Sequence, residues 1–221
     1  MHVNMPNNQK PIMERLNDFV NQLKNIDVYR QITSVLSWDQ ETMMPSGSIK
    51  ARADQLATLA GKIHDLWNDP ILTSTLEKSV DLDKGTPLFN ATAEESAFIR
   101  EIYPIWKRNT QLSKKLITEL SEVTSIAQHQ WQEARESNDF SLFAPHLKRI
   151  IELQKEKVSQ LGYEGHPYNT LLDEYEPGMT VSKIDAIFTP LKEKTLTKIA
   201  NEATNSPKHL QGPFDCDQQM E

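Results

Sequence analysis

Apolar residues recur at alternating intervals of four and three along most of this 221-residue chain, and this spacing constrains the fold more than any other feature. The clearest stretches run from Ile12 to Ile26, from Val28 to Met43 and from Ile49 to Trp67. Such intervals bring apolar side chains to one face of an α-helix, whereas a half-buried strand needs strict alternation. Strand-like alternation is hard to find, and only seven glycines are present. The pattern predicts an all-α fold.

The connections between these three stretches are very short. Asp27 is placed to cap the second helix, which ends at Pro45, and Ser46 or Ser48 is placed to cap the third. Consecutive helices joined by such short turns pack antiparallel to one another. We therefore expect helical hairpins in the N-terminal part of the chain.

A longer periodic run follows, opened by a capping box of Thr92 and Glu95 and continuing to about Glu136. As one helix it would be roughly 65 Å long at about 1.5 Å per residue. Pro104 lies inside it and is expected to kink or divide it near its start. The predicted fold is thus antiparallel helical hairpins packed around one long, Pro104-kinked helix.

Cap signals delimit the remaining helices. Asp69 and Pro70 are typical of a cap followed by a first helical residue, Gly162 is typical of a helix end, and Thr180 is placed to cap a last helix. We divide the chain into residues 1–80, a helical hairpin region, and residues 81–221, a long-helix region, within a single structural unit.

Composition excludes several classes of function. A net charge of −7 argues against a nucleic-acid-binding protein, which usually carries a basic surplus. Cys216 is the single cysteine, so no internal disulfide can form, and a reducing cytoplasm is expected. The N-terminus lacks the apolar core of a signal peptide, and no stretch of 18 apolar residues predicts a membrane span. We expect neither a nucleic-acid nor a membrane partner.

The sequence carries no complete catalytic motif: neither a glycine-rich phosphate loop nor a G-x-S-x-G elbow is present. Acidic neighbours make Cys216 a poor thiolate. His129 and Glu133 could share a metal on a helix, but two ligands are incomplete, and we interpret them as a solvated face. His64 and His146 are expected at the surface or its boundary. His166 is the best histidine candidate for a functional role, because it lies beside Pro167 in irregular chain.

The stretch SWDQETMMPSGSIKARADQL, residues 37–56, contains two carboxylates that resemble an acid–base pair. Asp39 and Glu41 are two residues apart, however, so on a helix they point about 200° away from each other. Asp39 falls in the middle of the stripe formed by Val28, Ile32 and Val35, and an inward carboxylate needs a partner.

Arg52 is the expected partner of Asp39. The two residues lie at equal distances from the turn at Pro45 and Ser46, so antiparallel pairing of the two helices brings them level. We interpret the pair as a clamp that holds the register of the helices, and a direct ligand or substrate role for Asp39 as the alternative. Asp39 and Arg52 are thus structural candidates, and no catalytic, cofactor-binding or metal-binding residue is assigned.

Two blocks of this sequence resemble a known family. W-D-Q-E-T-M-M-P, a polar turn and R-A-D-Q-L-A-T-L, together with P-Y-N-T-L-L-D-E-Y-E-P-G-M-T at residues 167–180, are similar to segments of the thermostable (Taq-type) carboxypeptidases, a family of zinc metallocarboxypeptidases. The resemblance implies an almost entirely helical, cleft-shaped enzyme, often homodimeric, that removes residues from peptide C-termini with broad specificity. It also implies a zinc ion held by an H-E-x-x-H helix and a further glutamate.

The chain departs from the family in length. Family members are roughly twice as long, and their metal ligands lie in the second half, so no zinc ligand can be assigned here. The resemblance implies an N-terminal fragment of a zinc carboxypeptidase, inactive by itself, in which residues 1–80 form a lid region and residues 81–221 one wall of the cleft. The alternative is a free-standing all-helical interaction or dimerisation module.

Overall fold

The computed structural model describes residues 17–88 and 90–202. The chain forms two compact units, Met1–Gly162 and Tyr163–Glu221. Trp67 and Leu76, which precede residue 81, share one hydrophobic core with Ile99, which follows it. Helices bury their apolar faces against one another, and the helices that share a core need not be adjacent in the sequence.

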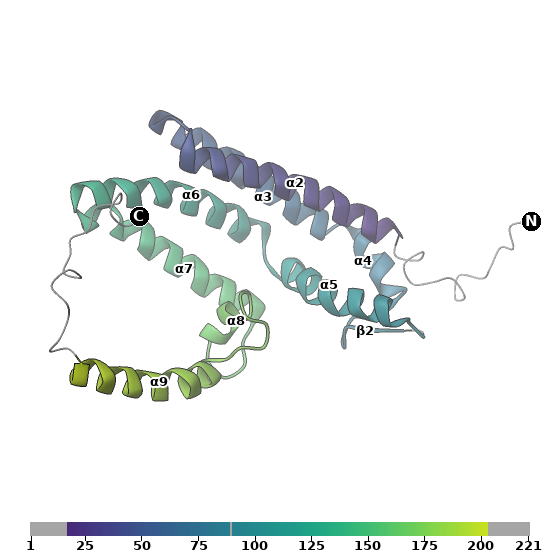
Figure 1. Cartoon of the computed structure of the whole chain (residues 1–221). Helices are drawn as coiled ribbons and strands as arrows, with labels where there is room; N and C mark the ends of the chain where they lie inside the picture. Colours follow the sequence, from purple (N-terminus) through teal and green to yellow (C-terminus); the bar gives the residue numbers. More distant parts are fainter. Residues whose placement is uncertain (1–16, 89, 203–221) are drawn as a thin grey trace, which may run out of the picture. The chain divides into compact units, whose positions relative to one another are not determined.

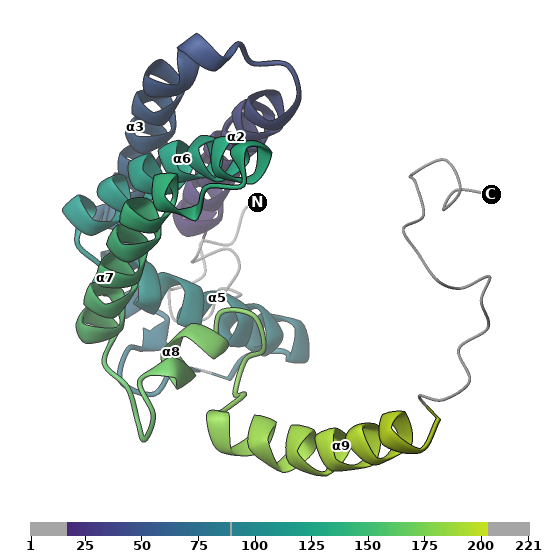
Figure 2. The same ribbon diagram turned by 90° about the vertical axis from the view of Figure 1, so that its left-hand side faces the viewer.

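The first unit is built almost entirely of helices, which confirms the all-α prediction (Figure 1). α3 packs most extensively on α6, and α2 and α7 pack on α3 and α6 respectively. Figure 2 shows α2, α3 and α6 side by side. The elements, in chain order, are α2 (Asn17–Thr42), η2 (Ser46–Ser48), α3 (Ile49–Trp67), α4 (Pro70–Glu77), β1 (Val80–Asp81), β2 (Thr86–Pro87), α5 (Ala93–Gln111), α6 (Lys114–Ser137), η3 (Phe140–Leu142) and α7 (Ala144–Leu161).

The first two predicted helices are a single helix. α2 runs without interruption through Asp27, which does not cap a helix but accepts a hydrogen bond from the side chain of Gln31 at 2.7 Å. The apolar face nevertheless changes at this point. Ile26 is buried and Val28 is 54% exposed, since two residues of helix rotate the side chain by about 200°. The prediction of a break was wrong because a change of face was interpreted as a change of helix.

The predicted long helix is divided, but not at Pro104. Pro104 lies inside α5, which continues to Gln111, and the chain becomes extended at Leu112 before α6 begins. Leu112 is buried, and the hydroxyl of Ser113 caps α6 by accepting from the backbone N–H of Leu116 at 3.3 Å. The burial of Leu112 and the cap at Ser113 thus end α5. Pro104 removes only one backbone donor, and the helix continues past it.

Most of the predicted caps are confirmed. The carboxylate of Asp69 accepts from the backbone N–H of Ile71 at 2.8 Å, and Thr92 and Glu95 form the reciprocal capping box. α7 ends at Gly162, whose φ of 74° is favourable for glycine. Ser48 precedes α3 but makes no side-chain cap hydrogen bond. The short turn η2 starts the helix there instead.

A small antiparallel β-hairpin interrupts the helices, with Val80 paired to Pro87 and Asp81 to Thr86. The turn needs Gly85, which has a φ of 69° and lies against the ring of Tyr103 on α5. The hydroxyl of Tyr103 donates to the carbonyl of Leu82. The hairpin thereby packs on α5 and covers one end of the main core, whose buried members are Phe19, Ile26, Trp67, Leu72, Leu76, Val80, Ile99, Tyr103 and Trp106.

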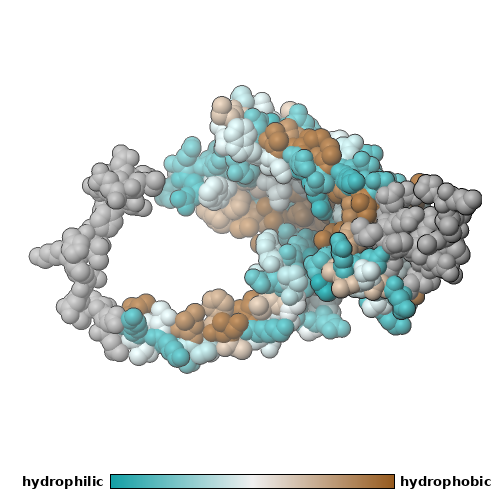
Figure 3. Space-filling view, turned by 45° about the vertical axis from the view of Figure 1, so that its right-hand side comes forward, coloured by the Kyte–Doolittle hydropathy of each residue, from teal (hydrophilic) through white to brown (hydrophobic). Residues whose placement is uncertain are grey.

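The second unit contains the short helix α8 (Tyr168–Leu172) and the helix α9 (Val181–Glu202). The segment 163–180, predicted as mostly irregular, consists of turns around α8. Apolar side chains of α9 are exposed by between 52% and 58%, and Figure 3 shows them gathered along this helix at the lower edge of the view. These side chains are Ile187, Phe188, Leu191, Leu196 and Ile199.

Candidate functional site

Asp39 and Arg52 are held together at the corner between α2 and α3. A guanidinium N–H of Arg52 donates to the carboxylate of Asp39, and the two side chains form an ion pair. The pair is unequal in burial, since the side chain of Arg52 is 10% exposed and that of Asp39 is 35% exposed. The cation is therefore the member that depends on protein partners, while the carboxylate keeps access to water.

Arg52 has two further acceptors. It donates to the backbone carbonyl of Leu36 and, through Nε, to the side-chain oxygen of Gln55 at 3.0 Å. One guanidinium thus joins the last turns of α2 to the first turn of α3, using the planar fork of donors that only arginine provides. That the clamp sets the helix register remains a proposal.

The helical phase from which the pair was predicted is wrong. Val28, Ile32 and Val35, expected to face the core, are exposed by 54%, 43% and 64%. Asp39 lies on the same outer side of α2 as these residues, which agrees with its partial exposure. Arg52 reaches it from α3 because an arginine stem is long enough to pass beside a helix while its head group meets a carboxylate near solvent.

A polar cluster links α2 to α6 next to this corner. The side-chain amide of Gln40 donates to the carbonyl of Ser125 at 3.0 Å and to the side chain of Gln128 at 3.1 Å. The hydroxyl of Ser125 in turn donates to Gln40 at 2.8 Å. A small cavity of about 130 Å³ adjoins the cluster; it is lined by Gln40, Met44, Ser46, Ile49, Gln128, His129 and Gln132. Its polar lining consists of glutamine amides, the Ser46 hydroxyl and the His129 imidazole.

His129 and Glu133 contact each other on α6. The imidazole Nε2 lies 3.3 Å from the Glu133 carboxylate, so the two residues satisfy each other. The side chain of His129 is 21% exposed and lines the cavity, so it is less solvated than the sequence indicated. Within residues 17–88 and 90–202, no group of three or more histidine, cysteine, aspartate or glutamate side chains could hold a metal ion.

The other histidine candidates have structural contacts. His64 lies at the boundary of the surface, as expected: its side chain is 12% exposed and its Nε2 lies 2.7 Å from the carbonyl of Leu112, where α5 ends. The Nδ1 of His166 accepts from the backbone N–H of Tyr168 at 3.1 Å, which orders the turn before α8. Cys216 lies outside the described residues.

Ion pairs on the surface connect α3 and α6. Lys50 lies 2.6 Å from Asp54 and 2.9 Å from Glu122, and these carboxylates raise its pKa to about 12. Lys114 lies 2.7 Å from Asp65 and lowers the pKa of that carboxyl group. All of these groups are solvent-exposed, so the ion pairs contribute little to stability and mainly favour this arrangement of α3 against α6.

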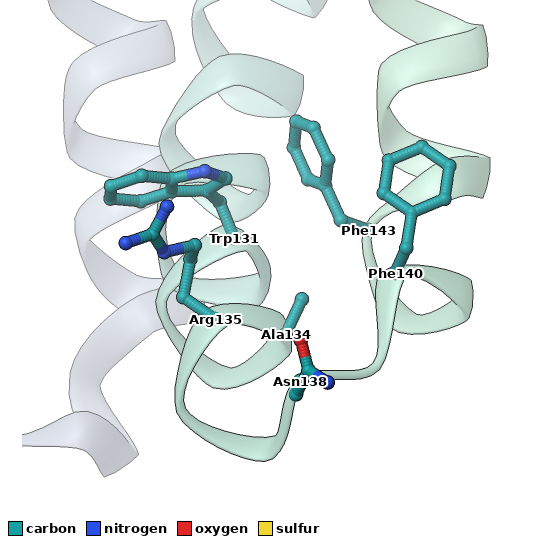
Figure 4. Close-up of a pocket in the computed structure, with 6 residues that line it drawn as sticks. All are labelled: Trp131, Ala134, Arg135, Asn138, Phe140 and Phe143. Atoms are coloured by element: carbon teal, nitrogen blue, oxygen red, sulfur yellow. The ribbon is translucent and has the colours of Figure 1, made fainter. Parts of the chain in front are cut away.

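A larger pocket of about 440 Å³ lies where α6 ends and η3 leads into α7. Trp131 and Arg135 stand on one side of its opening and Phe140 and Phe143 on the other, while Ala134 and Asn138 lie between them (Figure 4). The guanidinium carbon of Arg135 is 5.8 Å from the centroid of the Trp131 ring. The two phenylalanine rings meet edge to face at 6.3 Å.

This aromatic pocket was missed by sequence reasoning. Trp131 and Arg135 are four residues apart on α6, which places them on one face. Asn138 then adopts a left-handed conformation with a φ of 53° and ends the helix. The sequence identifies Trp131 and Arg135 as neighbours on one helix face and predicts a turn after them. The return of Phe140 and Phe143 toward Trp131 depends on the geometry of that turn.

Comparison with known proteins gives one family. The sequence model described as carboxypeptidase Taq (M32) metallopeptidase matches residues 18–221. Thermostable carboxypeptidase 1 of Thermus thermophilus is 35% identical over 170 residues, which cover 72% of this chain and 32% of that protein. Carboxypeptidase 1 of Bacillus subtilis is 29% identical over 192 residues, covering 86% and 37%. The chain therefore spans about a third of the length of these relatives.

Solved structures give the same result. The structure titled as Pyrococcus furiosus carboxypeptidase matches with a TM-score of 0.69 and 31% identity, covering 88% of this chain and 38% of that one. The structure titled BsuCP has a TM-score of 0.79 at 24% identity, covering 94% and 41%, and supports the fold alone. The described helices include none that is long and apolar enough to cross a membrane.

Proposed function

Because this chain belongs to the carboxypeptidase Taq (M32) metallopeptidase family, we propose that it is the N-terminal part of a zinc-dependent carboxypeptidase that removes C-terminal residues from peptides with broad specificity. The observation that carries the proposal is the family match over residues 18–221, which includes both signature blocks. The chain covers about a third of the matched relatives, and in this proposal catalysis requires sequence from their unmatched part.

The described residues do not fit a catalytic zinc ion. Such an ion needs three protein ligands with an open position for water, and His129 with Glu133 offers two groups that already bind each other. We place the zinc ligands in the part of the relatives that this chain does not match. In this proposal the 221-residue chain alone neither holds zinc nor cleaves peptides.

The proposal gives the corner of α2 and α3 a supporting role. Asp39 and Arg52 hold the two helices of the lid region together without touching substrate. The exposed face of α9 suits a helix that packs against the remainder of the enzyme, since large unpartnered apolar faces usually mark contact surfaces. A homodimer of the whole enzyme and a cytoplasmic location, which the single cysteine favours, are part of the same proposal.

The experiment compares the 221-residue chain with the product of its gene's whole reading frame. The whole product should release C-terminal residues from an N-blocked peptide, lose activity with a chelator and regain it with zinc. The 221-residue chain, purified without affinity tags that bind metal, should contain no stoichiometric zinc and show no release above background. One tightly held zinc per chain, or cleavage by this chain, contradicts the proposal.

A free-standing interaction module is the second candidate. The exposed apolar stripe of Val28, Ile32 and Val35 favours it, because a helical hairpin can use such a face for association. The reading frame beyond Glu221 separates the two candidates. An in-frame H-E-x-x-H supports the carboxypeptidase, whereas a stop codon followed by unrelated sequence supports the module.

A further inference from the structure

The pocket at the end of α6 combines aromatic walls with a single cation. Trp131 is 48% exposed and Phe140 is 64% exposed, so two large apolar side chains are held partly in water around a space of about 440 Å³. That volume lies within the usual range for small-molecule sites, which are mostly apolar with a few polar groups that orient the ligand. Arg135 and Asn138 are the polar groups of this lining.

Arg135 is available to a ligand. Among the described residues no carboxylate forms an ion pair with it, and its guanidinium lies over the face of the Trp131 ring. An arginine stacked on an aromatic ring keeps its edge N–H groups directed outward, where they can donate to an anion. The neighbouring Asp139 does not line the pocket, and its carboxylate accepts from the backbone and hydroxyl of Ser141 at 2.9 Å and 2.6 Å.

The backbone sets the geometry of the pocket. Asn138 ends α6 in the left-handed conformation, and its N–H bonds back to the carbonyl groups of the last turn. η3 then places Phe140 opposite Trp131 across the opening (Figure 4). The aromatic walls therefore stand on helix termini held by backbone hydrogen bonds, which limits the conformational entropy that a ligand would have to remove.

We propose that this pocket binds an amphipathic carboxylate, in which an aromatic or branched apolar side chain enters between Trp131 and Phe140 while the carboxylate accepts hydrogen bonds from Arg135. A peptide C-terminus and a free apolar amino acid share this chemistry. The inference rests on the pocket alone and stands whether or not the proposed carboxypeptidase activity is found. A ligand of about 15 heavy atoms at an open site should bind with a Kd on the order of 1 mM.

Binding is measured with the 221-residue chain by following the indole N–H resonance of Trp131, assigned from its loss in Trp131→Phe. N-acetyl-phenylalanine represents the peptide C-terminus, phenylalanine the free amino acid, and N-acetyl-phenylalaninamide lacks the carboxylate. We expect a saturable shift with N-acetyl-phenylalanine and about five- to tenfold weaker binding of the amide, because a charge-assisted hydrogen bond is lost. The ratio of the dissociation constants of N-acetyl-phenylalanine and phenylalanine shows whether the pocket prefers a peptide C-terminus or a free amino acid.

Arg135→Gln provides the decisive comparison. In this variant the acid and the amide should bind equally weakly, since the group that distinguishes them is gone. Phe140→Ala should weaken both ligands, and its exposed position keeps the fold intact, which circular dichroism checks. Arg100→Gln, an exposed arginine that pairs with Glu101 on α5, is the matched control and should bind as the unaltered chain does. The proposal is overturned by the absence of a saturable shift up to about 10 mM, or by equal binding of acid and amide to the unaltered chain.

Discussion

Removing Asp39 should destabilise the protein more than removing Arg52, although Asp39 is the more exposed member of the pair. Asp39→Ala leaves the guanidinium of Arg52 buried, with only the carbonyl of Leu36 and the side chain of Gln55 as acceptors. Both are neutral, so the positive charge loses its counterion in a site with little access to water. Arg52→Met leaves a carboxylate that is 35% exposed and can be hydrated again.

The magnitudes follow from this difference in burial. Breaking a fully buried pair costs about 3–5 kcal/mol, and an exposed pair contributes about 0–1 kcal/mol. Asp39→Ala lies between these limits, at about 2 kcal/mol, because a buried cation keeps two of its three acceptors. Arg52→Met should cost about 1 kcal/mol, since methionine retains the packing of the arginine stem.

The double variant gives the sharpest test. Without the guanidinium there is no stranded charge, so Asp39→Ala with Arg52→Met should cost about 1 kcal/mol and be more stable than Asp39→Ala alone. The coupling would then be about 2 kcal/mol, within the range for residues in direct contact. In a domain of this size a change of 1 kcal/mol shifts Tm by about 2–4 °C, so the rescue should be about 2–4 °C.

Urea unfolding followed by circular dichroism at 222 nm measures these changes in the free energy of unfolding. Lys50→Gln is the control on the same helix, because its side chain is 67% exposed and its loss should leave the midpoint unchanged. Equal costs for the two single variants, or a double variant less stable than Asp39→Ala, would refute the argument that Arg52 depends on Asp39 for its counterion.

Other consequences of the structure are testable in the same way. A Cβ atom at Gly85 would come within 2.4 Å of the Tyr103 ring, so Gly85→Ala should lower the free energy of unfolding by about 2 kcal/mol, whereas Gly47→Ala, with no atom within 4 Å, should not. Hydrogen bonds lower the pKa of Asp139, so its contribution to stability is present above its unfolded pKa of about 3.9 and is lost as pH falls through the lower folded value. Asp139→Asn should therefore flatten the loss of stability in acid; an unchanged profile of unfolding against pH contradicts this. An environment-sensitive apolar dye should bind the 221-residue chain, and less dye should bind after Phe188→Glu on α9, while a chain without dye binding would show that this face is covered.

The sequence alone determined the helical class of this protein and most helix boundaries. Intervals of four and three residues specify helices because they match the 3.6-residue turn, and this held from α3 to α7. Asp69, Thr92 and Gly162 mark their helix ends through interactions within a few residues, which sequence order preserves. The partner of Asp39 could also be found from sequence, since a short turn between two helices leaves few possible registers.

Tertiary structure decided which apolar faces are buried and where the long run divides. Periodicity places Val28, Ile32 and Val35 on one side of α2, but no local signal states whether another helix covers that side. The division between α5 and α6 depends on Leu112, whose burial against α6 and α7 draws the chain out of the helix, while the local signal of Pro104 lies elsewhere.

The aromatic pocket shows the same limit for a candidate site. Trp131 and Arg135 are neighbours on α6 by sequence spacing, but the position of Phe140 depends on the backbone angles of one residue, Asn138. A left-handed residue reverses the chain direction within one peptide unit, and an asparagine can adopt that conformation or a helical one. Packing of α7 against α6 selects between them, so the sequence alone specifies the side chains of this pocket and the fold specifies that they meet.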